Sequence, residues 1–253
     1  GRQPIPLTDP QTAWVVYTGR LDVFTVPLEQ GKIAGIRRHL LRAEAGQVVL
    51  GLGAEGEADA QPIAFLAVGG PETRVVQVPR ARLEELAQEP EFSAHVVRMV
   101  EGWVQGLAQA LAVNLPPKES YQVQPGDNAL EAYRPARALR GVVWVEAHAG
   151  AFSWLGMPAL PVPATGFSPL SGPLWVRASE PGRLHAVDTA DFCLHDSAWS
   201  GLEHFHSTVR AAMALRLEHA AQADGKRLQE RADLNREQVA QALTQLAGVM
   251  EPA

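Results

Sequence analysis

The stretch between Pro79 and Pro117 constrains the fold most, because its prolines divide it into helices of defined length. Proline lacks the N–H that a helix interior needs, so Pro79 and Pro90 mark helix starts, and the pair Pro116-Pro117 ends the second helix. We predict a short helix over Arg80–Gln88 and a longer one over 90–114. Apolar residues recur on one side of the longer helix, at Phe92, Val96, Met99, Val100, Trp103, Leu107 and Leu111. Such a stripe needs a protein surface to lie on.

Short strand-like runs separated by turns precede and follow these helices. The strands predicted before the helices are Ala13–Tyr17, Leu21–Val26, Ile33–Arg42, Val48–Leu50, Ile63–Val68 and Thr73–Val78. Those predicted after them are Gly141–Glu146, Ala151–Leu155, Leu174–Ala178, Arg183–Asp188 and Asp191–Leu194, preceded by the short, weak segments Tyr121–Val123 and Ala129–Leu130. Runs of short strands at this spacing are typical of antiparallel rolls and barrels rather than βαβ units. The proline-rich stretch Met157–Pro173 is predicted to form a loop or edge segments.

Helical periodicity returns in the last quarter of the chain. One apolar stripe comprises Leu202, Phe205, Val209, Met213 and Leu217. Asp224 and Gly225 are predicted to interrupt or kink this helix, and Asn235 to cap a further one. We therefore predict a mainly β chain with α-helices: two jelly-roll-like β units, each followed by its own helices, in domains 1–117 and 118–253.

Composition excludes several classes of function. The 253 residues carry a formal net charge of −6 and contain no run of Lys or Arg, so neither nucleic acid nor an anionic lipid surface is expected as the main partner. Cys193 is the single cysteine, which excludes a disulfide framework and a cysteine-based zinc site. No apolar run approaches the roughly 20 residues of a membrane-spanning helix.

Two further stretches are candidates for binding. Arg37, Arg38 and Arg42 form a basic cluster, and strand alternation places Arg38 and Arg42 on one face. This cluster is either an exposed strand with extended arginine side chains or a contact for an anion or an acidic partner. The glycine-rich stretch from Gly51 to Glu57 lacks the Lys-Ser/Thr of a P-loop and carries two carboxylates, so it is interpreted as a solvated loop.

The densest set of polar side chains lies towards the C-terminus. It comprises His185, Asp188, Asp191, Cys193, His195, Asp196, His204 and His206. His204 and His206 are the candidates for metal ligands, but residues two apart on a helix diverge by about 200° and do not chelate together. Histidines at a seam between sheet and helix are the default interpretation, and no metal site is predicted.

No arrangement in the sequence predicts a reaction. There is no Gly-x-Ser-x-Gly motif, and Cys193 lies between two apolar residues where a thiol is normally inert. Glu146 and His148 form either an acid/base pair or a solvent-facing strand end. We therefore predict no catalytic residue, no cofactor-binding residue and no enzyme activity for this region.

One segment resembles the last strand and helices of a cyclic nucleotide-binding domain. It runs from Thr73 to Arg80 and continues through Leu83–Leu86 and Pro90–Phe92. The resemblance implies a β-roll with flanking helices. In that family a Gly-Glu pair is followed several residues later by an arginine for the cyclic phosphate. Here Gly56-Glu57 is followed by no arginine until Arg74.

A longer resemblance covers nearly the whole chain. The segments Trp14–Phe24, Gly35–Leu52, Phe65–Gly70, Gly141–Gly156 and Trp199–His206 are similar to one family. It is the N-terminal cytosolic region of the permease/ATP-binding subunit of ABC transporters that export bacteriocins with nitrile-hydratase-like leader peptides. This resemblance implies that spanning helices and an ATP-hydrolysing domain, which binds ATP, follow in the full-length protein. It also implies a location on the cytoplasmic side of the bacterial inner membrane.

The resulting expectation is a non-catalytic regulatory or substrate-recognition region of a peptide exporter. Its partners would be a precursor or leader peptide and the remaining transporter domains or a partner subunit. Arg37, Arg38 and Arg42 are the residues expected to meet an acidic leader helix. One alternative is a β-roll that senses a small molecule or nucleotide, and another is a cupin-like metalloenzyme.

Overall fold

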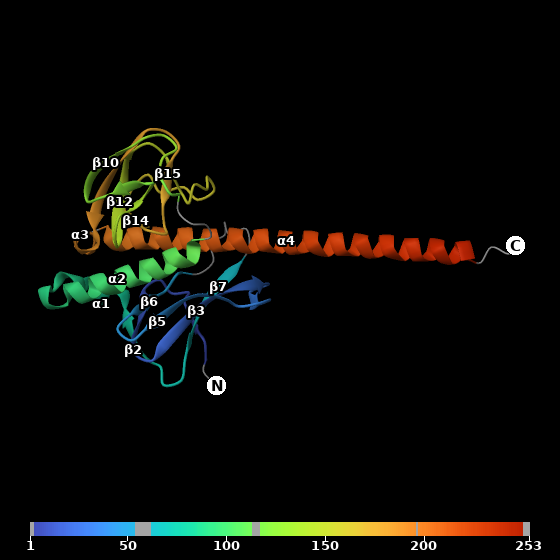
Figure 1. The fold of residues 1–253 in the computed structure, drawn as a ribbon. Helices are drawn as coiled ribbons and strands as arrows, with labels where there is room; N and C mark the ends of the chain where they lie inside the picture. Colours follow the sequence, from blue (N-terminus) through green and yellow to red (C-terminus); the bar gives the residue numbers. More distant parts are fainter. Residues whose placement is uncertain (1–2, 54–61, 113–116, 196, 250–253) are drawn as a thin grey trace. The chain divides into compact units, whose positions relative to one another are not determined.

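The computed structural model describes residues 3–53, 62–112, 117–195 and 197–249, with the backbone alone at 221 and 240–249. The chain divides into two compact units, Gly1–Ala214 and Leu215–Ala253. The first unit contains two β-rolls and the helices around them (Figure 1). The described part of the second unit is helical.

The first β-roll consists of two small sheets. One contains β1 (Ile5–Pro6), β7 (Ile63–Gly69), β3 (Arg20–Glu29) and β4 (Lys32–Ile33) in that order, with β5 (Arg38–Glu44) also paired to β3. The other has the order β6 (Val48–Leu50), β2 (Thr12–Thr18) and β8 (Arg74–Pro79). All these pairs are antiparallel. In β3, Leu21, Val23 and Thr25 are buried, which fixes a facing that the alternation alone leaves open.

The single strand predicted over Ile33–Arg42 is wrong. The chain there forms β4 and β5, separated by a bend at Gly35, whose φ of 79° is a left-handed conformation that favours glycine. Arg37 therefore precedes β5 instead of lying within a strand. Arg38 and Arg42 lie on β5 and are both exposed, but the predicted common face is wrong: a register shift pairs Arg42 with Asp22 and Arg38 with Thr25.

Two helices follow the first roll at the predicted places. They are α1 (Arg80–Gln88) and α2 (Pro90–Leu111), and Pro90 occupies the first turn of α2. Val96, Val100, Trp103, Leu107 and Leu111 are buried as the stripe predicts, whereas Phe92 in the first turn is 39% exposed. One side of α2 packs on β5 and β6, and α2 also contacts α3, β12 and β14 of the second roll. Figure 1 shows α2 between the two rolls.

The second roll also consists of two sheets. One has the order β10 (Gly126–Leu130), β16 (Gly182–Asp188), β12 (Val142–Ala149) and β14 (Ser168–Ser171). The other has the order β13 (Phe152–Trp154), β15 (Val176–Ala178), β11 (Pro135–Ala138) and β9 (Tyr121–Val123). The pair β9–β11 is parallel, which the prediction of antiparallel pairing did not include. β14 is an edge strand, as expected for the proline-rich stretch that contains it.

The strand predicted over Asp191–Leu194 is wrong, because this segment belongs to the short helix α3 (Thr189–Cys193). The side chain of Asp188 accepts a hydrogen bond from the backbone N–H of Asp191 at 2.8 Å and so caps the helix. The apolar run at Phe192-Cys193 fits a buried helical turn as well as a strand, and periodicity cannot separate the two over so few residues.

The last helix, α4 (Ala198–Val249), runs on where an interruption was predicted at Asp224 and Gly225. A single glycine costs about 1 kcal/mol in a helix interior. Neighbouring ion pairs oppose that cost, with Arg227 to Asp224 at 3.5 Å and Lys226 to Glu230 at 3.9 Å. The predicted cap at Asn235 is wrong for the same reason, since this residue lies inside α4.

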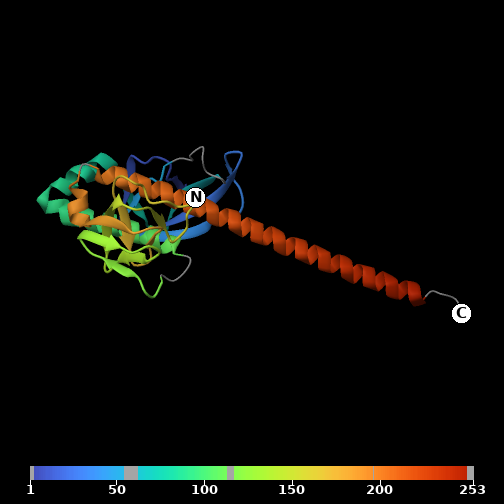
Figure 2. The same cartoon turned by 90° about the horizontal axis from the view of Figure 1, so that it is seen from above.

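Two β-rolls, each followed by helices, confirm the predicted fold class. Viewed from above, α1 and α2 lie beside the first turns of α4 (Figure 2). Among the described residues, no helix combines the length and the apolarity needed to cross a bilayer.

Candidate ligand-binding site

The loop that follows β6 is anchored to the first roll by its backbone. The N–H of Gly51 donates to the carbonyl of Thr12 at 3.0 Å, and the N–H of Leu52 donates to the carbonyl of Leu7 at 2.8 Å. A Cβ atom at Gly51 would lie 1.8 Å from the carbonyl oxygen of Asp9, so a larger residue does not fit. The start of this loop is therefore held against the N-terminal segment, while residues 54–61 lie outside the described residues.

His206 of α4 contacts both this loop and helix α2. Its Nε2 accepts a hydrogen bond from the indole N–H of Trp103 in α2 at 2.9 Å, and the side chain also bonds to the backbone of Gly51. Because Nε2 is an acceptor, the ring proton is on Nδ1. Burial and the nearby charges of Arg210 and Arg80 lower the pKa of His206 to about 3. The imidazole is therefore neutral and joins three elements.

Arg210 lies one helical turn beyond His206 on α4. Its guanidinium donates to the carbonyl oxygen of Leu52 and, through Nη2, to the hydroxyl of Ser207 at 3.2 Å. Its Nε is buried and has no hydrogen-bond partner among the described residues. A buried N–H donor without an acceptor is costly, so this atom marks a position where an acceptor is missing.

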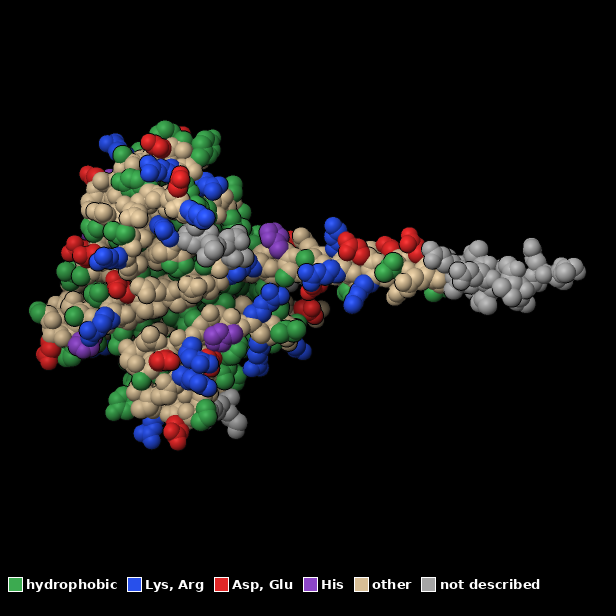
Figure 3. All heavy atoms as spheres, viewed as in Figure 1, with side chains coloured by type: hydrophobic (Ala, Val, Ile, Leu, Met, Phe, Trp, Pro, Cys, Tyr) green, Lys and Arg blue, Asp and Glu red, His purple; other side chains and the backbone are tan. Residues whose placement is uncertain are grey.

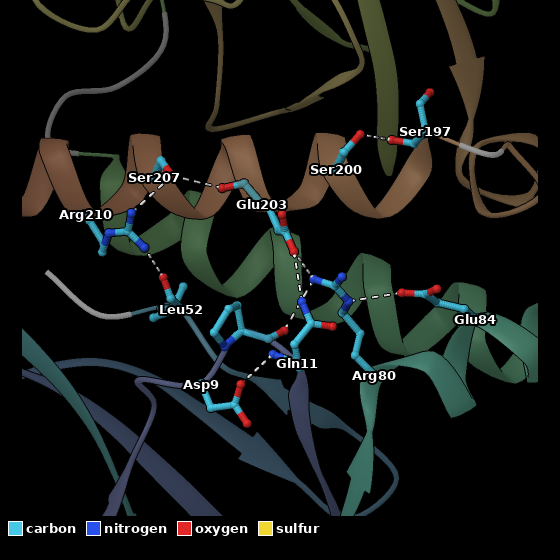
Figure 4. A network of polar contacts seen from close by, with 11 residues as sticks. Asp9, Gln11, Leu52, Arg80, Glu84, Ser197, Ser200, Glu203, Ser207 and Arg210 are labelled. Carbon is cyan, nitrogen blue, oxygen red and sulfur yellow. Dashed lines mark hydrogen bonds and ion pairs between the residues drawn. The ribbon is translucent and has the colours of Figure 1, made fainter. Parts of the chain in front are cut away.

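Arg80 and Glu203 form the second polar link between the first roll and α4 (Figure 4). Arg80 also donates to Glu84 at 3.0 Å and to the carbonyl of Pro10 at 3.3 Å. The amide of Gln11 donates to Glu203 at 3.4 Å. The Arg80 side chain is only 13% exposed, so this network is partly shielded from water.

A cavity of about 280 Å³ lies where these groups meet. It is lined by Pro10, Leu52, Gly53, Glu203, His206, Ser207 and Arg210. The charges of Arg210 and Arg80 both act to lower the pKa of the buried His206, and no carboxylate opposes them in that shift. Arg210 therefore brings a positive charge to the cavity, while the carboxylate of Glu203 in its lining is paired with Arg80.

The structure separates the predicted basic cluster from this cavity. Arg42 donates from Nε to Asp22 at 2.8 Å, and His39 is 3.1 Å from the same carboxylate. These contacts lower the pKa of Asp22 against the effect of its partial burial. Arg37 and Arg38 are exposed. None of the three arginines lines the cavity, and their role as a partner site stays a prediction.

The two predicted candidates for metal ligands, His204 and His206, lie in different environments on α4. His204 is exposed, whereas His206 is 4% exposed and bonded to Trp103. Within the described ranges, no three His, Cys, Asp or Glu side chains gather in an arrangement that could hold a metal ion.

The other polar candidates lie apart from the cavity. Glu146 accepts from the backbone N–H of Gly166 at 3.2 Å and lies 3.7 Å from His148, which stacks on His185. This places the pair at a solvent-facing strand end, one of the two interpretations left open. Cys193 is buried, and burial raises its pKa to about 12, so its thiol is not a nucleophile.

Sequence reasoning did not single out Arg80, Glu203 or Arg210. Arg80 was placed at a helix start and Arg210 between apolar stripe positions, with nothing local to link them. The one available signal was the Gly51–Gly53 stretch, since closely spaced glycines indicate close approach of another group. A Cβ atom at Gly53 would lie 2.5 Å from the guanidinium of Arg210.

Comparisons with known proteins give distant matches only. The sequence matches no protein-family model and no curated protein at a significant level. Among solved structures, cAMP-bound PfPKA-R (141–441) is 9% identical over 83% of this chain and 77% of that chain, with a TM-score of 0.25.

Two other solved structures match to a similar degree. A regulatory subunit of a cAMP-independent protein kinase A from Trypanosoma cruzi, bound to guanosine, is 11% identical over 87% of this chain and 82% of that chain, with a TM-score of 0.23. The regulatory domain of Toxoplasma gondii PKA with cAMP is 10% identical over the same shares, with a TM-score of 0.22. Likeness at this level identifies neither a ligand nor a function.

Proposed function

We propose that this region is a non-catalytic regulatory module in which the first β-roll senses a small anionic molecule. The ligand would bind in the cavity between the loop after β6 and the first turns of α4. The observation that carries the proposal is the buried Nε of Arg210, a cationic donor without an acceptor beside that cavity. An anionic oxygen placed there would form a charge-assisted hydrogen bond, which is stronger than a neutral one.

Arg210 would supply the positive charge that the loop itself lacks. The sequence from Gly51 to Gln61 contains no Lys or Arg, so a ligand phosphate or carboxylate would have to be met from another element. Arg210 comes from α4 and already contacts Leu52 of the loop. The cavity is small by the standard of ligand pockets, which usually span 300–1,000 Å³. A compact anion, or the charged end of a larger molecule, fits it best.

Ligand binding at this place would be coupled to α4. Arg210 holds the carbonyl of Leu52, so an anion that recruits the guanidinium changes the contact between the loop and the helix. The module therefore acts by redistributing hydrogen bonds of one arginine, with no bond made or broken in the ligand.

Thermal unfolding in the presence of anions tests the proposal. The probes are inorganic phosphate, AMP and 3′,5′-cyclic AMP, each compared with sodium chloride at equal ionic strength. A ligand at 100 times its dissociation constant adds about 2.7 kcal/mol to the free energy of unfolding. We expect one of the probes to raise the melting temperature of the unaltered protein and to lose this effect in Arg210→Gln.

The matched control is Arg227→Gln, an arginine on the exposed part of the same helix. It should respond to the anion as the unaltered protein does. If no probe stabilises the protein beyond the salt control, or if Arg210→Gln responds undiminished, the sensor proposal is wrong.

We also propose that the chain serves in a bacterial peptide exporter, on the cytoplasmic side of the inner membrane. The basis of this proposal is the resemblance drawn from five segments, which include Trp14–Phe24 and Trp199–His206, and no family model or curated protein matches the chain. The two proposals are compatible, since a sensing module can regulate a transporter. Reading the gene beyond Ala253 tests the exporter proposal: spanning helices followed by a Walker A motif support it, and their absence refutes it.

A further inference from the structure

One strand of the first roll has an unpaired edge. β5 pairs with β3 along residues 38–44, and no strand of the described chain pairs with its other edge. An edge strand presents backbone N–H and C=O groups that can pair with an added chain. Recognition by strand addition uses these groups for affinity and the alternate side chains for specificity.

A groove lies between β5, the turn that follows it and α2. It has a volume of about 350 Å³, and its lining includes Arg42, Gln47, Gly102, Gln105, Gly106 and Gln109. Gly102 keeps the groove open, since the nearest atom to a Cβ placed there is the amide nitrogen of Gln47 at 3.8 Å. Glutamine amides both donate and accept hydrogen bonds, which matches the two polar groups of a peptide backbone. Gln105 and Gln109 are exposed on the α2 side of the groove.

The charge around this edge is positive at its N-terminal end. Arg37 and Arg38 are exposed, and the register shift in β5 pairs Arg38 with Thr25 and Arg42 with Asp22, so these two arginines lie on different faces of the strand. Asp22 on β3 holds Arg42 and His39, whereas Arg37 and Arg38 have no ion-pair partner among the described residues. The face of the first unit seen in Figure 3 otherwise mixes Lys and Arg with Asp and Glu.

Ile33 and Ile36 beside them are 50% and 82% exposed. Such exposure next to two exposed arginines suits a segment that combines apolar and acidic residues.

From these observations we infer that β5 is a docking strand for an extended, acidic peptide segment, which adds to its free edge and lies in the groove against α2. Carboxylates at alternate positions of the peptide would face Arg38, and its apolar residues would face the exposed isoleucines. This inference is independent of the anion cavity, because the two sites share no residue.

The test measures fluorescence anisotropy of a labelled eight-residue peptide of alternating Glu and Val. A Lys-Val peptide and a Glu-Val peptide with proline at two central positions are the comparisons. We expect the Glu-Val peptide to bind the unaltered protein, and the other two to bind at least about tenfold more weakly, since like charges repel and proline cannot donate to a ladder. Equal binding of all three peptides would refute strand addition.

Two variants locate the site on the protein. Arg37→Glu combined with Arg38→Glu should weaken binding about tenfold, whereas charge reversal at the exposed Arg140 and Arg231 should leave it unchanged. Gly102→Leu fills the groove on a helix that accepts the side chain, and should abolish binding while the melting temperature is kept.

Gly225→Leu is the control for the helical substitution, because nothing lies within 4 Å of a Cβ there. Binding that survives both Gly102→Leu and the double reversal would overturn the inference. Arg210→Gln should retain peptide binding, so failure of the sensor proposal and failure of this one are distinguishable.

Discussion

The two β-rolls contact the first turns of α4 in chemically different ways. The first roll and the start of α1 meet α4 through polar groups: Arg80 of α1 with Glu203, the carbonyl of Leu52 with Arg210, and the backbone of Gly51 with His206. The second roll meets it through apolar packing, with Trp154 against Phe205 at 6.4 Å between ring centroids.

Gly201 of α4 extends the apolar contact. It is so close to the backbone of Phe167 that a Cβ atom would lie 2.7 Å from the carbonyl oxygen. Close packing tolerates little change, whereas hydrogen bonds can be exchanged for others of similar strength. The comparison indicates that close packing fixes the first turns of α4 on the second roll, whereas their hydrogen bonds to the first roll can be exchanged.

The largest expected effect comes from breaking the apolar contacts of the second roll. Phe192 stacks on Trp144 with ring centroids 3.5 Å apart and also meets Phe167 edge-on at 5.9 Å. Phe192→Ala removes a fully buried aromatic ring, so we expect a loss of about 3–5 kcal/mol in the free energy of unfolding. Urea denaturation measures this. A loss of stability below about 1 kcal/mol would mean that the second roll is not packed rigidly, against the contrast drawn here between the two rolls.

An intermediate effect is expected from pH, through His206. Its pKa is lowered to about 3 in the folded state, so the unfolded chain binds the proton first. Stability is therefore complete above the unfolded pKa of about 6.5 and falls as the pH drops below it. Between pH 6.5 and pH 5 the loss should be about 1.6 kcal/mol, because the slope rises from half of its limit of about 1.4 kcal/mol per pH unit as the pH falls below 6.5.

The control for the pH effect is His206→Gln, which carries no titrating group. The stability of this variant should be flatter between pH 6.5 and pH 5, whatever its stability at neutral pH. Carboxylates with lowered pKa values, such as Asp9 and Asp127, titrate at lower pH, so they do not change the stability between pH 6.5 and pH 5. Equal slopes in the two proteins would show that His206 is not buried as a neutral ring.

The smallest effect is expected at the ion pair of Arg80 and Glu203. Glu203 is 41% exposed, so Glu203→Gln should cost only about 0.5–1 kcal/mol. A double-mutant cycle with Arg80→Gln isolates the pairwise energy and corrects for the bonds of Arg80 to Glu84 and Pro10. A coupling energy above about 3 kcal/mol would contradict the comparison. The polar contacts between the first roll and α4 would then be as rigid as the apolar contacts with the second roll.

Sequence reasoning predicted the fold far better than the site. Strong periodicity and the positions of Pro79 and Pro90 were sufficient for α1 and α2, because proline limits a helix wherever it stands. The short apolar run at Phe192-Cys193 was predicted as a strand but forms a helix, since so few residues fit either type of secondary structure. The cavity could not be predicted because Leu52, Glu203 and Arg210 are brought together only by tertiary packing.

The position of α2 has a consequence for how the first unit unfolds. The helix buries Trp103 and Leu107 and contacts strands of both rolls, so it belongs to two cores at once. Neither roll can lose this helix without exposing part of its own interior. Melting of one roll should therefore propagate to the other, and calorimetry should find one cooperative transition for the unit that joins them.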